Sequence, residues 1–350
     1  AARDLSRAIE LANADVRPPG ELTEWLSDLA DAVRLVRAAP EPFELCEKVI
    51  ARVDAAGTLH DRVTARIAAG RMLAALHAFD AARAQLSQAE IVAQSEDALL
   101  RRVLTTSAEL AARQGDFKRS ASLLERLETV PRHDDDKAED HRIFLFLSQA
   151  NAALGRRPEA LRYLGRAEQL LPGDAAAACE RTKCLALVDY FSRDFRGSAA
   201  ACERAVDAAR ELGLVYEVAL NLHNLGDTLV RLEDYPRAYG AFKQSLSYCD
   251  EASFERLASH NRMFLAFLDA VNGDEKGLVQ LHLGIAYAEA HDFTWDVLTG
   301  RWLLAKVHLR KDERVAARAE YEKLRSLARG VGNRLVEGDC DEALALIPRT

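Results

Sequence analysis

The sequence lacks the features that mark membrane proteins, nucleic-acid binders and disulfide-rich domains. No apolar run approaches the ~20 residues of a membrane-spanning helix, so we expect no membrane contact. Lys and Arg number 47 against 55 Asp and Glu, a net charge of −8, which argues against nucleic acid as a partner of this chain. No two cysteines have C-x-x-C spacing, so we expect buried free thiols in a reducing cytoplasm. The cysteines are Cys46, Cys179, Cys184, Cys202, Cys249 and Cys340.

Motifs for catalysis and nucleotide binding are missing as well. Residues 273–277 (GDEKG) lack the order of a P-loop. Residues 330–332 (GVG) follow a helical pattern, which predicts a helix C-terminal cap and not a dinucleotide-binding turn. Neither H-E-x-x-H nor G-x-S-x-G occurs. We therefore expect no enzyme, no cofactor and no metal.

One acidic cluster occupies residues 133–141 (HDDDKAEDH). Its carboxylates could hold a hard cation, but the cluster has no glycine and no calcium-loop spacing. We interpret it as a solvated linker whose acidic residues favour the N-terminus of the next helix. Lone histidines such as His77 and His282 are interpreted as half-buried helix residues.

What the chain does contain is long stretches of Ala, Leu, Arg and Glu, which are strong helix formers. Apolar residues recur at steps of three and four, as at Leu222, Leu225 and Leu229, and period-2 alternation is nearly absent. The pattern predicts an all-α protein. Several aromatic residues could form a base-stacking platform, but basic residues do not cluster beside them, so we interpret most as packing between helices. They are Phe144, Phe146, Phe191, Phe195, Phe264, Phe267, Trp295 and Trp302.

A short turn followed by a small inward-packing residue recurs along the chain. Asp116, Asp194, Asp234 and Asp274 stand where they could cap the helix after the turn. Glycines stand at the end of the helix before it, at residues 115, 155 and 273. Each repeat therefore predicts a helix–turn–helix. The inward-packing residues are 37–40 residues apart: Leu45, Ala82, Ser120, Ala160, Ser198, Ala238, Leu278 and Ala317.

The repeat resembles the tetratricopeptide repeat over about residues 21–347, although each copy is longer than the common ~34 residues. Such long copies resemble those of large bacterial signalling ATPases, regulators of the maltose-activator type, kinase-linked sensor regions and intracellular peptide-pheromone receptors. The resemblance implies a right-handed α-solenoid of about eight helix pairs. The clearest copy is Leu222, Leu225, Gly226, Leu229, Tyr235, Ala238 and Phe242, and a second is Val63, Gly70, Leu73, Phe79, Ala82, Leu86 and Ala89.

The domain organisation expected from these patterns has three parts. An N-terminal helix and linker occupy residues 1–20, with the helix over residues 1–13. The repeat array covers residues 21–332, and a capping helix with a short tail covers residues 333–350. One continuous superhelical domain is favoured over the two domains that length alone suggests. Because no initiator methionine or signal-like stretch is present, we expect a chain processed or cut from a longer protein.

The resemblance also implies that the first helix of each pair lines a concave groove. Basic side chains there could hold an acidic side chain or a terminal carboxylate, and an Asn amide can pair with peptide N–H and C=O groups. The alternative is a solvated face with ordinary surface charge. The groove candidates are Arg71, Thr105, Glu109, Arg113, Gln149, Lys183, Tyr190, His223, Asn224, Asp227, Arg231, His260, Met263, Phe267, Trp302, Lys306 and Arg310.

Polar residues on one face of the clearest repeat are expected to be unnecessary for the core. Their spacing keeps them on a single side of the helix, opposite its packed side. We therefore expect substitutions there to weaken binding and to leave stability nearly unchanged. The residues are His223, Asn224, Asp227 and Arg231.

These observations favour a noncatalytic protein- or peptide-binding scaffold, the sensor or docking region of a larger bacterial signalling or regulatory protein. Its partner would be a protein or peptide in the concave groove. The alternative is a small-molecule effector-binding domain of a transcriptional regulator. A compact aromatic-lined pocket in place of an open groove would favour that alternative. The sequence gives no indication of oligomeric state.

Overall fold

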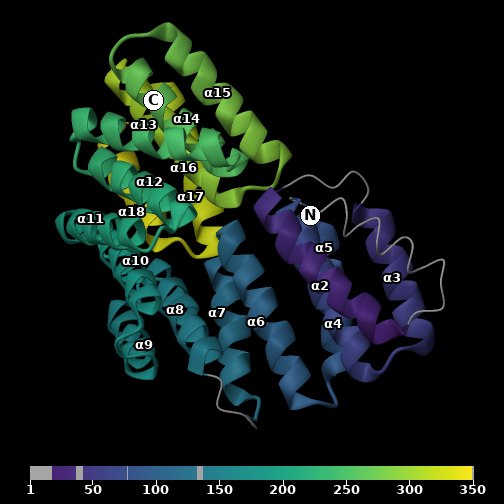
Figure 1. Cartoon of the computed structure of the whole chain (residues 1–350). Coiled ribbons are helices and arrows are strands. Elements are labelled where there is room, and N and C mark those ends of the chain that lie inside the picture. Colours follow the sequence, from purple (N-terminus) through teal and green to yellow (C-terminus); the bar gives the residue numbers. More distant parts are fainter. Residues whose placement is uncertain (1–17, 37–41, 77, 132–136, 349–350) are drawn as a thin grey trace. The chain divides into compact units, whose positions relative to one another are not determined.

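The computed structural model describes residues 18–36, 42–76, 78–131 and 137–348. The helix predicted over residues 1–13 and the acidic residues 133–136 lie outside these ranges. Within them the chain forms helices and turns and no strand (Figure 1). The helices are α2 (Pro19–Val36), α3 (Pro42–Ala56), α4 (Leu59–Ala75), α5 (Phe79–Ala93), α6 (Asp97–Gln114), α7 (Phe117–Thr129), α8 (Lys137–Ala153), α9 (Arg157–Leu170), α10 (Ala175–Phe191), α11 (Phe195–Glu211), α12 (Val215–Arg231), α13 (Tyr235–Ala252), α14 (Glu255–Val271), α15 (Glu275–Ala290), α16 (Thr294–Arg310), α17 (Arg314–Val331) and α18 (Arg334–Leu346).

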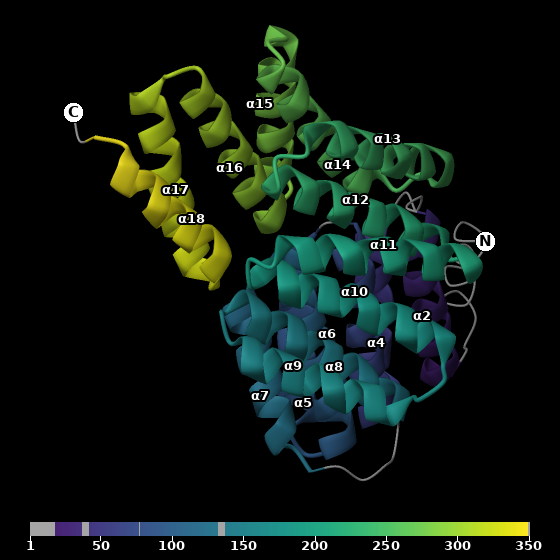
Figure 2. The ribbon, with the colours of Figure 1, turned by 90° about the vertical axis from the view of Figure 1, so that its left-hand side faces the viewer.

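The all-α prediction is confirmed, and the helices pair as the repeat spacing requires. Helix α5 packs on α4, α9 on α8, α11 on α10, α13 on α12, α15 on α14 and α17 on α16. Consecutive first helices also touch, as α8 touches α10 and α14 touches α16. Upstream of the pairs, α2 packs more extensively on α4 than on α3. The result is a solenoid of stacked helix pairs, whose later members appear in chain order in Figure 2.

The chain divides into two compact units. Unit 1 comprises residues 1–111 and 122–135, and unit 2 comprises residues 112–121 and 136–350. Unit 1 has its own core, in which leucines of α2 pack against Val49 and Val53 of α3 and Met72 of α4. Unit 2 contains the largest core, built from α10 to α18. The single array predicted over residues 21–332 stays a prediction.

The turns form as the glycine and aspartate pattern predicts. The glycines at 115, 155 and 273 have φ between +76° and +92°, a left-handed conformation that glycine adopts at little cost. The predicted aspartate caps accept backbone N–H bonds at the start of the second helix of a pair. Asp194, for example, accepts from the N–H of Gly197 at 2.9 Å. Residues 330–332 end α17, with Gly332 as its left-handed cap. These local signals therefore fix where each helix begins and ends.

The inward-packing position is occupied as predicted in most pairs. Ala82, Ala160, Ala238 and Ala317 are completely buried. The prediction was wrong by one residue in α15, where Leu278 is only partly buried and Gly277 takes the close contact. A Cβ on Gly277 would stand 2.5 Å from a backbone nitrogen of α14. This pair approaches more closely than an alanine would allow.

Candidate functional site

The helix pairs of unit 2 curve until the end of the chain meets the start of the unit. Lys118 Nζ, in the first turn of α7, donates to the carbonyl oxygen of Arg329 in the last turn of α17 at 2.6 Å. Arg256 of α14 donates to the carbonyl oxygen of Arg113 at the end of α6, at 3.3 Å. We call the surface that α10, α12, α14 and α16 present toward the inside of this curve the inner face.

Aromatic rings fill the centre of the curve. Phe117, Phe191 and Trp295 meet edge to face, with ring centroids 5.5–5.9 Å apart. Leu335 of α18 is buried in the same cluster. Aromatic side chains here pack helices together, as the sequence analysis interpreted most of them. The inside of unit 2 is consequently filled at this level and is not an open groove.

Arg231, at the end of α12, is the centre of the polar part of the inner face. Its guanidinium lies 3.8 Å from the ring centroid of Trp302, a cation–π contact. Its Nε donates to Tyr190 Oη at 3.1 Å, and Tyr190 donates in turn to Asp227 Oδ2 at 2.9 Å. Its Nη1 forms an ion pair with Asp339 of α18. We call Tyr190, Asp227, Arg231, Trp302 and Asp339 the Arg231 site.

Burial shapes the charges of this site. It raises the pKa of Asp227 and holds the pKa of Tyr190 well above its usual range. Burial opposes the charge of Arg231, but Tyr190, Asp339 and Asp227 outweigh it and raise its pKa. The side chain of Arg231 is only 6% exposed, so its charge depends on these protein partners. Asp227 Oδ1 has no hydrogen-bond partner among the described residues.

Two histidines lie beside the Arg231 site. The rings of His223 and His260 are 4.4 Å apart, and both are buried. His223 Nδ1 is 2.9 Å from Asn261 Oδ1, and the Asn261 amide donates to Ser245 (2.8 Å). This arrangement assigns the proton of neutral His223 to Nδ1. Burial, with His260 next to it, lowers the pKa of His223 to about 3, so both histidines act as neutral packing groups near pH 7.

A buried carboxylate anchors the second histidine. Asp296 of α16 lies 3.7 Å from His260 Nδ1 and 3.1 Å from Arg256 Nη2. Burial disfavours its charge, but Arg256 and His260 outweigh burial and lower the pKa of Asp296. Because Arg256 also holds the end of α6, this pair contributes to the curvature of unit 2.

The outer edge of the inner face is basic. Lys306 Nζ is 4.8 Å from the Trp302 ring centroid and 3.4 Å from Glu233 Oε1. Burial lowers the pKa of Lys306, and Glu233 opposes that shift. Arg310 Nη2 donates to Tyr235 Oη at 2.8 Å. These cations keep part of their surface toward solvent, with side chains 19% and 43% exposed.

The other groove candidates are more scattered. Phe267 and Met263 are buried in the core of unit 2. Lys183 pairs with Glu217 on the next first helix (Nζ–Oε2 2.7 Å). Gln149 is half-buried on α8.

Three further candidates belong to unit 1. There Arg71 is exposed, Thr105 is buried and Glu109 is half-buried. Arg113 is exposed at the end of α6, in unit 2. Within unit 2 the structure thus brings together Tyr190 of α10, Asp227 and Arg231 of α12 and Trp302 of α16.

The expectation that the polar face of α12 is unnecessary for the core was wrong for three of its four residues. His223, Asp227 and the side chain of Arg231 are at most 7% exposed. The tight curve of unit 2 covers this face with neighbouring first helices and with α18. Asn224 alone is half-buried, and its amide makes no hydrogen bond to a described residue.

The partners of these residues lie outside the first-helix register that predicted the groove. Asp339 and Arg193 reach the Arg231 site from the capping helix and from a turn, 108 and 38 residues away from Arg231 in the chain. Asp296 lies on a first helix but in its first turn, outside the register used for the candidates. Charged residues at turns and in first turns are a signal that points to Arg193 and Asp296, whereas Asp339 lies in the middle of α18 and has no such local signal.

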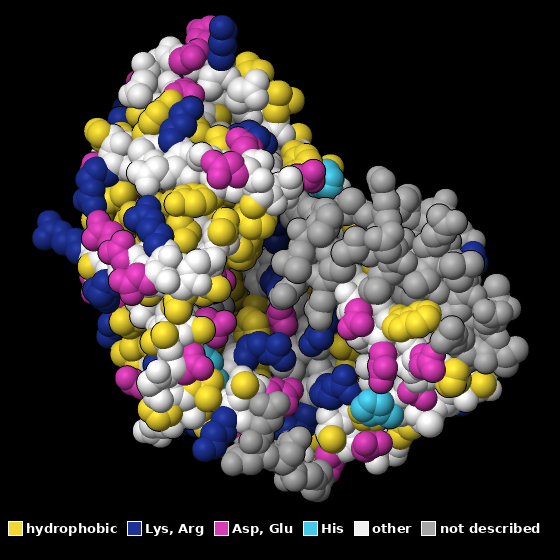
Figure 3. All heavy atoms as spheres, in the orientation of Figure 1, with side chains coloured by type: hydrophobic (Ala, Val, Ile, Leu, Met, Phe, Trp, Pro, Cys, Tyr) yellow, Lys and Arg dark blue, Asp and Glu magenta, His cyan; other side chains and the backbone are white. Residues whose placement is uncertain are grey.

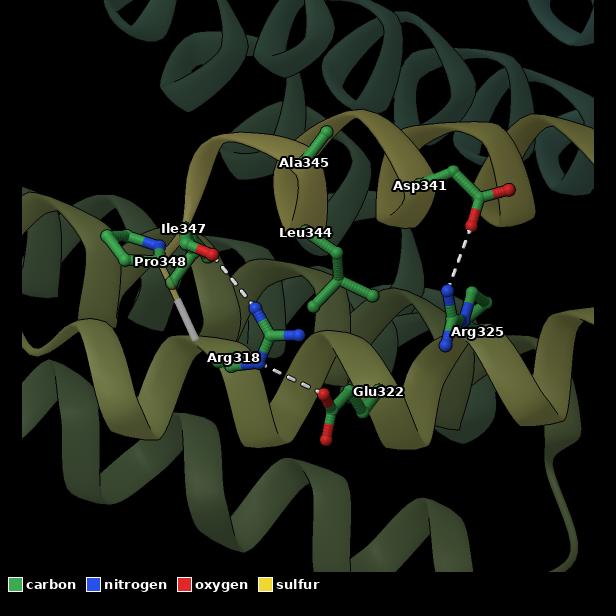
Figure 4. Close-up of a pocket in the computed structure, with 8 residues that line it drawn as sticks. All are labelled: Arg318, Glu322, Arg325, Asp341, Leu344, Ala345, Ile347 and Pro348. Carbon is green, nitrogen blue, oxygen red and sulfur yellow. Dashed lines mark hydrogen bonds and ion pairs between the residues drawn. The ribbon is translucent and has the colours of Figure 1, made fainter. Parts of the chain in front are cut away.

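A pocket lies between α17 and α18 (Figure 4). Arg318 donates to the carbonyl oxygen of Ile347 (2.8 Å) and pairs with Glu322, while Arg325 pairs with Asp341 at 3.2 Å. Its charges are therefore already paired. Arg318, Glu322, Arg325, Asp341, Leu344, Ala345, Ile347 and Pro348 line it, and none is aromatic. It is not the aromatic-lined pocket that would favour a small-molecule regulator.

The described surface of unit 2 carries charges of both signs on the face seen in Figure 3. Acidic and basic side chains are interspersed there without a patch of one sign. All six cysteines are free and buried, as predicted. The described part of the chain contains no group of three His, Cys, Asp or Glu residues placed to hold a metal ion. None of its helices is long and apolar enough to cross a membrane.

Comparison with known proteins supports the fold. No protein-family model matches the chain, and no curated protein sequence matches it significantly. A Rap protein solved in complex with competence and sporulation factor is 15% identical, covers 92% of this chain and 98% of its own, and has a TM-score of 0.60. The Rap conjugation gene regulator of plasmid pLS20, solved with the Phr* peptide, is 13% identical, with coverages of 88% and 94% and a TM-score of 0.56.

Both solved structures belong to tetratricopeptide-repeat proteins. At these sequence identities the likeness concerns the fold alone. It agrees with the paired helices, with the buried small residue after the turn in most pairs and with the left-handed residues that follow α6, α8, α10, α12, α14 and α16. The chain therefore has the tetratricopeptide-repeat solenoid fold that its repeat resembles.

Proposed function

We propose that the chain is a noncatalytic peptide- or protein-binding scaffold, the sensor or docking part of a bacterial signalling or regulatory protein. Its ligand contacts the inner face of unit 2. The observation that carries this proposal is the Arg231 site, where an arginine stacked on Trp302 binds the carboxylate of a helix, Asp339. A site built this way recognises a peptide side chain by charge, fork geometry and ring contact together.

The neighbouring residues suit a peptide backbone as well. Asn224 lies on the same side of α12 as Asp227 and Arg231, three and seven residues before them. Its half-buried amide has no partner among the described residues, so it is available to accept from one peptide N–H and donate to one C=O. Lys306 and Arg310 extend the basic character along α16. The peptide in the pLS20 regulator's structure shows that a protein of this fold accommodates such a ligand.

The test is a selection from a random peptide library on the immobilised chain, followed by calorimetric titration of the enriched peptides. Asn224→Ala should weaken binding by about 1–2 kcal/mol, roughly 5- to 30-fold, because two amide hydrogen bonds are lost. Lys243→Ala, on the outer side of α13, is the matched control and should leave affinity unchanged. Selection of no peptide would refute the proposal. Loss of affinity in the control alone would move the site to the outer surface.

A further inference from the structure

Helix α18 is held across the inner face by its acidic side. Asp339 Oδ1 lies 2.7 Å from Arg193 Nη2, while its Oδ2 pairs with Arg231. Glu342, one helical turn later, accepts from Arg193 Nη1 through both carboxylate oxygens, at 3.0 and 3.1 Å. Arg193 lies on the turn between α10 and α11. The contacts join residues 108 to 149 positions apart, although repeats of a solenoid normally touch only their neighbours.

The opposite side of α18 makes apolar contacts. Val336 and Cys340 are buried in one apolar core with Tyr321 and Leu324 of α17. The two last helices therefore form one block. The same apolar core continues into α10 and α12, and the polar contacts of α18 with Arg193 and Arg231 are ion pairs. Ion pairs can be exchanged for another carboxylate without loss of charge compensation, whereas an apolar core has no such substitute.

The backbone at Arg193 is left-handed, as it is at Glu233 and Asp312 at the equivalent turns. Arg193 has a φ of +63° at the turn position where other repeats have Gly115, Gly155 and Gly273. A residue with a Cβ is disfavoured in this left-handed conformation. Glu233 occupies the equivalent position one repeat later, with a φ of +58°, and contacts Lys306. At both turns a charged side chain that reaches the inner face stands where glycine would be favoured.

We propose that α18 is a tethered ligand of the inner face, whose two carboxylates occupy the site of Arg193, Arg231 and Trp302 until an acidic peptide replaces them. The proposal rests on the proposed peptide binding and names its ligand class. Arg231 is almost completely buried, so any ligand that displaces α18 must itself bring a carboxylate, because the arginine would otherwise be left charged and unpaired. The spacing of Asp339 and Glu342 points to a peptide with two carboxylates about one helical turn apart.

The experiment uses a fluorescent peptide of residues 334–347, carrying Cys340→Ser, as a ligand added in trans to the full chain. Its affinity is measured by fluorescence anisotropy for the unsubstituted chain and for the Asp339→Asn/Glu342→Gln chain. We expect at least tenfold tighter binding to the doubly substituted chain, because its own α18 no longer competes by charge. Glu342→Gln alone should give a smaller gain, and it perturbs only a carboxylate that is 68% exposed.

Three controls separate this mechanism from general loosening of the structure. Asp341→Asn makes the same charge change on the same helix, but this carboxylate pairs with Arg325 of α17, so we expect no gain. Adding Arg231→Gln to the double variant should abolish the gain. The third control is a peptide of the same length with Asp339→Asn and Glu342→Gln. The reference is the affinity of the unsubstituted chain for the acidic peptide. The neutral peptide should not exceed that affinity with any of the chains.

Equal affinities for the unsubstituted and doubly substituted chains overturn the proposal, as does a neutral peptide that binds like the acidic one. One further outcome separates the two proposals. If a library-selected peptide loses affinity with Asn224→Ala but binds the unsubstituted and the doubly substituted chains equally, the tethered-ligand mechanism is overturned. The proposed function then still stands.

Discussion

Replacing Gly277 by alanine tests the close contact between α14 and α15. A Cβ at this position would stand 2.5 Å from the backbone nitrogen of Ala270 and 2.6 Å from the carbonyl oxygen of Ala266, both on α14. It would also stand 3.0 Å from Asp269 Cβ. Backbone atoms of a helix cannot rotate away as a side chain can. The substitution therefore forces α14 and α15 apart.

Two effects of opposite sign determine how much Gly277→Ala changes the free energy of unfolding. Alanine gains up to about 1 kcal/mol over glycine in a helix, less near the first turn where Gly277 lies. Inserting a methyl group into a closely packed contact costs about 1–3 kcal/mol, and contact with backbone on two sides places the cost toward the upper end of that range. We expect a net loss of about 1–2 kcal/mol in the free energy of unfolding.

The assay is urea unfolding followed by circular dichroism, with Gly165→Ala and Gly240→Ala as matched controls. These two glycines lie within α9 and α13 and have no atom within 4 Å of an added Cβ. Both controls should gain about 0.5–1 kcal/mol from helix propensity alone. A Gly277→Ala chain as stable as the controls would show that α14 and α15 are further apart than the structure places them.

Three further predictions concern the core, the histidines and catalysis. Ala238→Asp places a carboxylate at a completely buried contact. It should lower the free energy of unfolding by about 3–5 kcal/mol and unfold the adjoining helix pairs locally. Thermal melts like those of the unsubstituted chain would contradict the repeat register. Burial lowers the pKa of His223 to about 3 in the folded chain. Between pH 6.5 and 3, His223 is therefore protonated in the unfolded chain but not in the folded one. The free energy of unfolding falls as the pH falls, by up to about 1.4 kcal/mol per pH unit. Urea midpoints should therefore decline less steeply from pH 7 to 5 for His223→Gln, and parallel declines would refute this assignment. Hydrolase, kinase and nucleotide-binding assays should be blank, and nucleotide binding at micromolar affinity would contradict the motif analysis.

Sequence reasoning predicted the helix pairs because their signals are local. The glycines at residues 115, 155 and 273, the aspartate caps such as Asp194 and the small residues after the turns all act within one turn of chain. The one misplaced residue, Leu278, follows from the same logic: the spacing allowed either neighbour, and only the close approach of α14 selects Gly277.

The site was predictable only in part. Tyr190, Asp227, Arg231 and Trp302 share the first-helix register, and the structure brings them together. Their burial and the arrival of Asp339 depend on the curvature of unit 2. Curvature is the sum of small rotations between successive pairs, and no single residue spacing encodes that sum.

The contact of Lys118 with Arg329 has a consequence for how unit 2 comes apart. An open solenoid frays from its ends, because a terminal repeat has a neighbour on one side only. Here the first and last segments of unit 2 are tied together across 211 positions, so each end has a second neighbour. Fraying then requires the tie to break first, which couples the stability of α18 to that of α7. Amides at both ends of unit 2 consequently exchange with solvent through one shared opening, rather than through two independent ones.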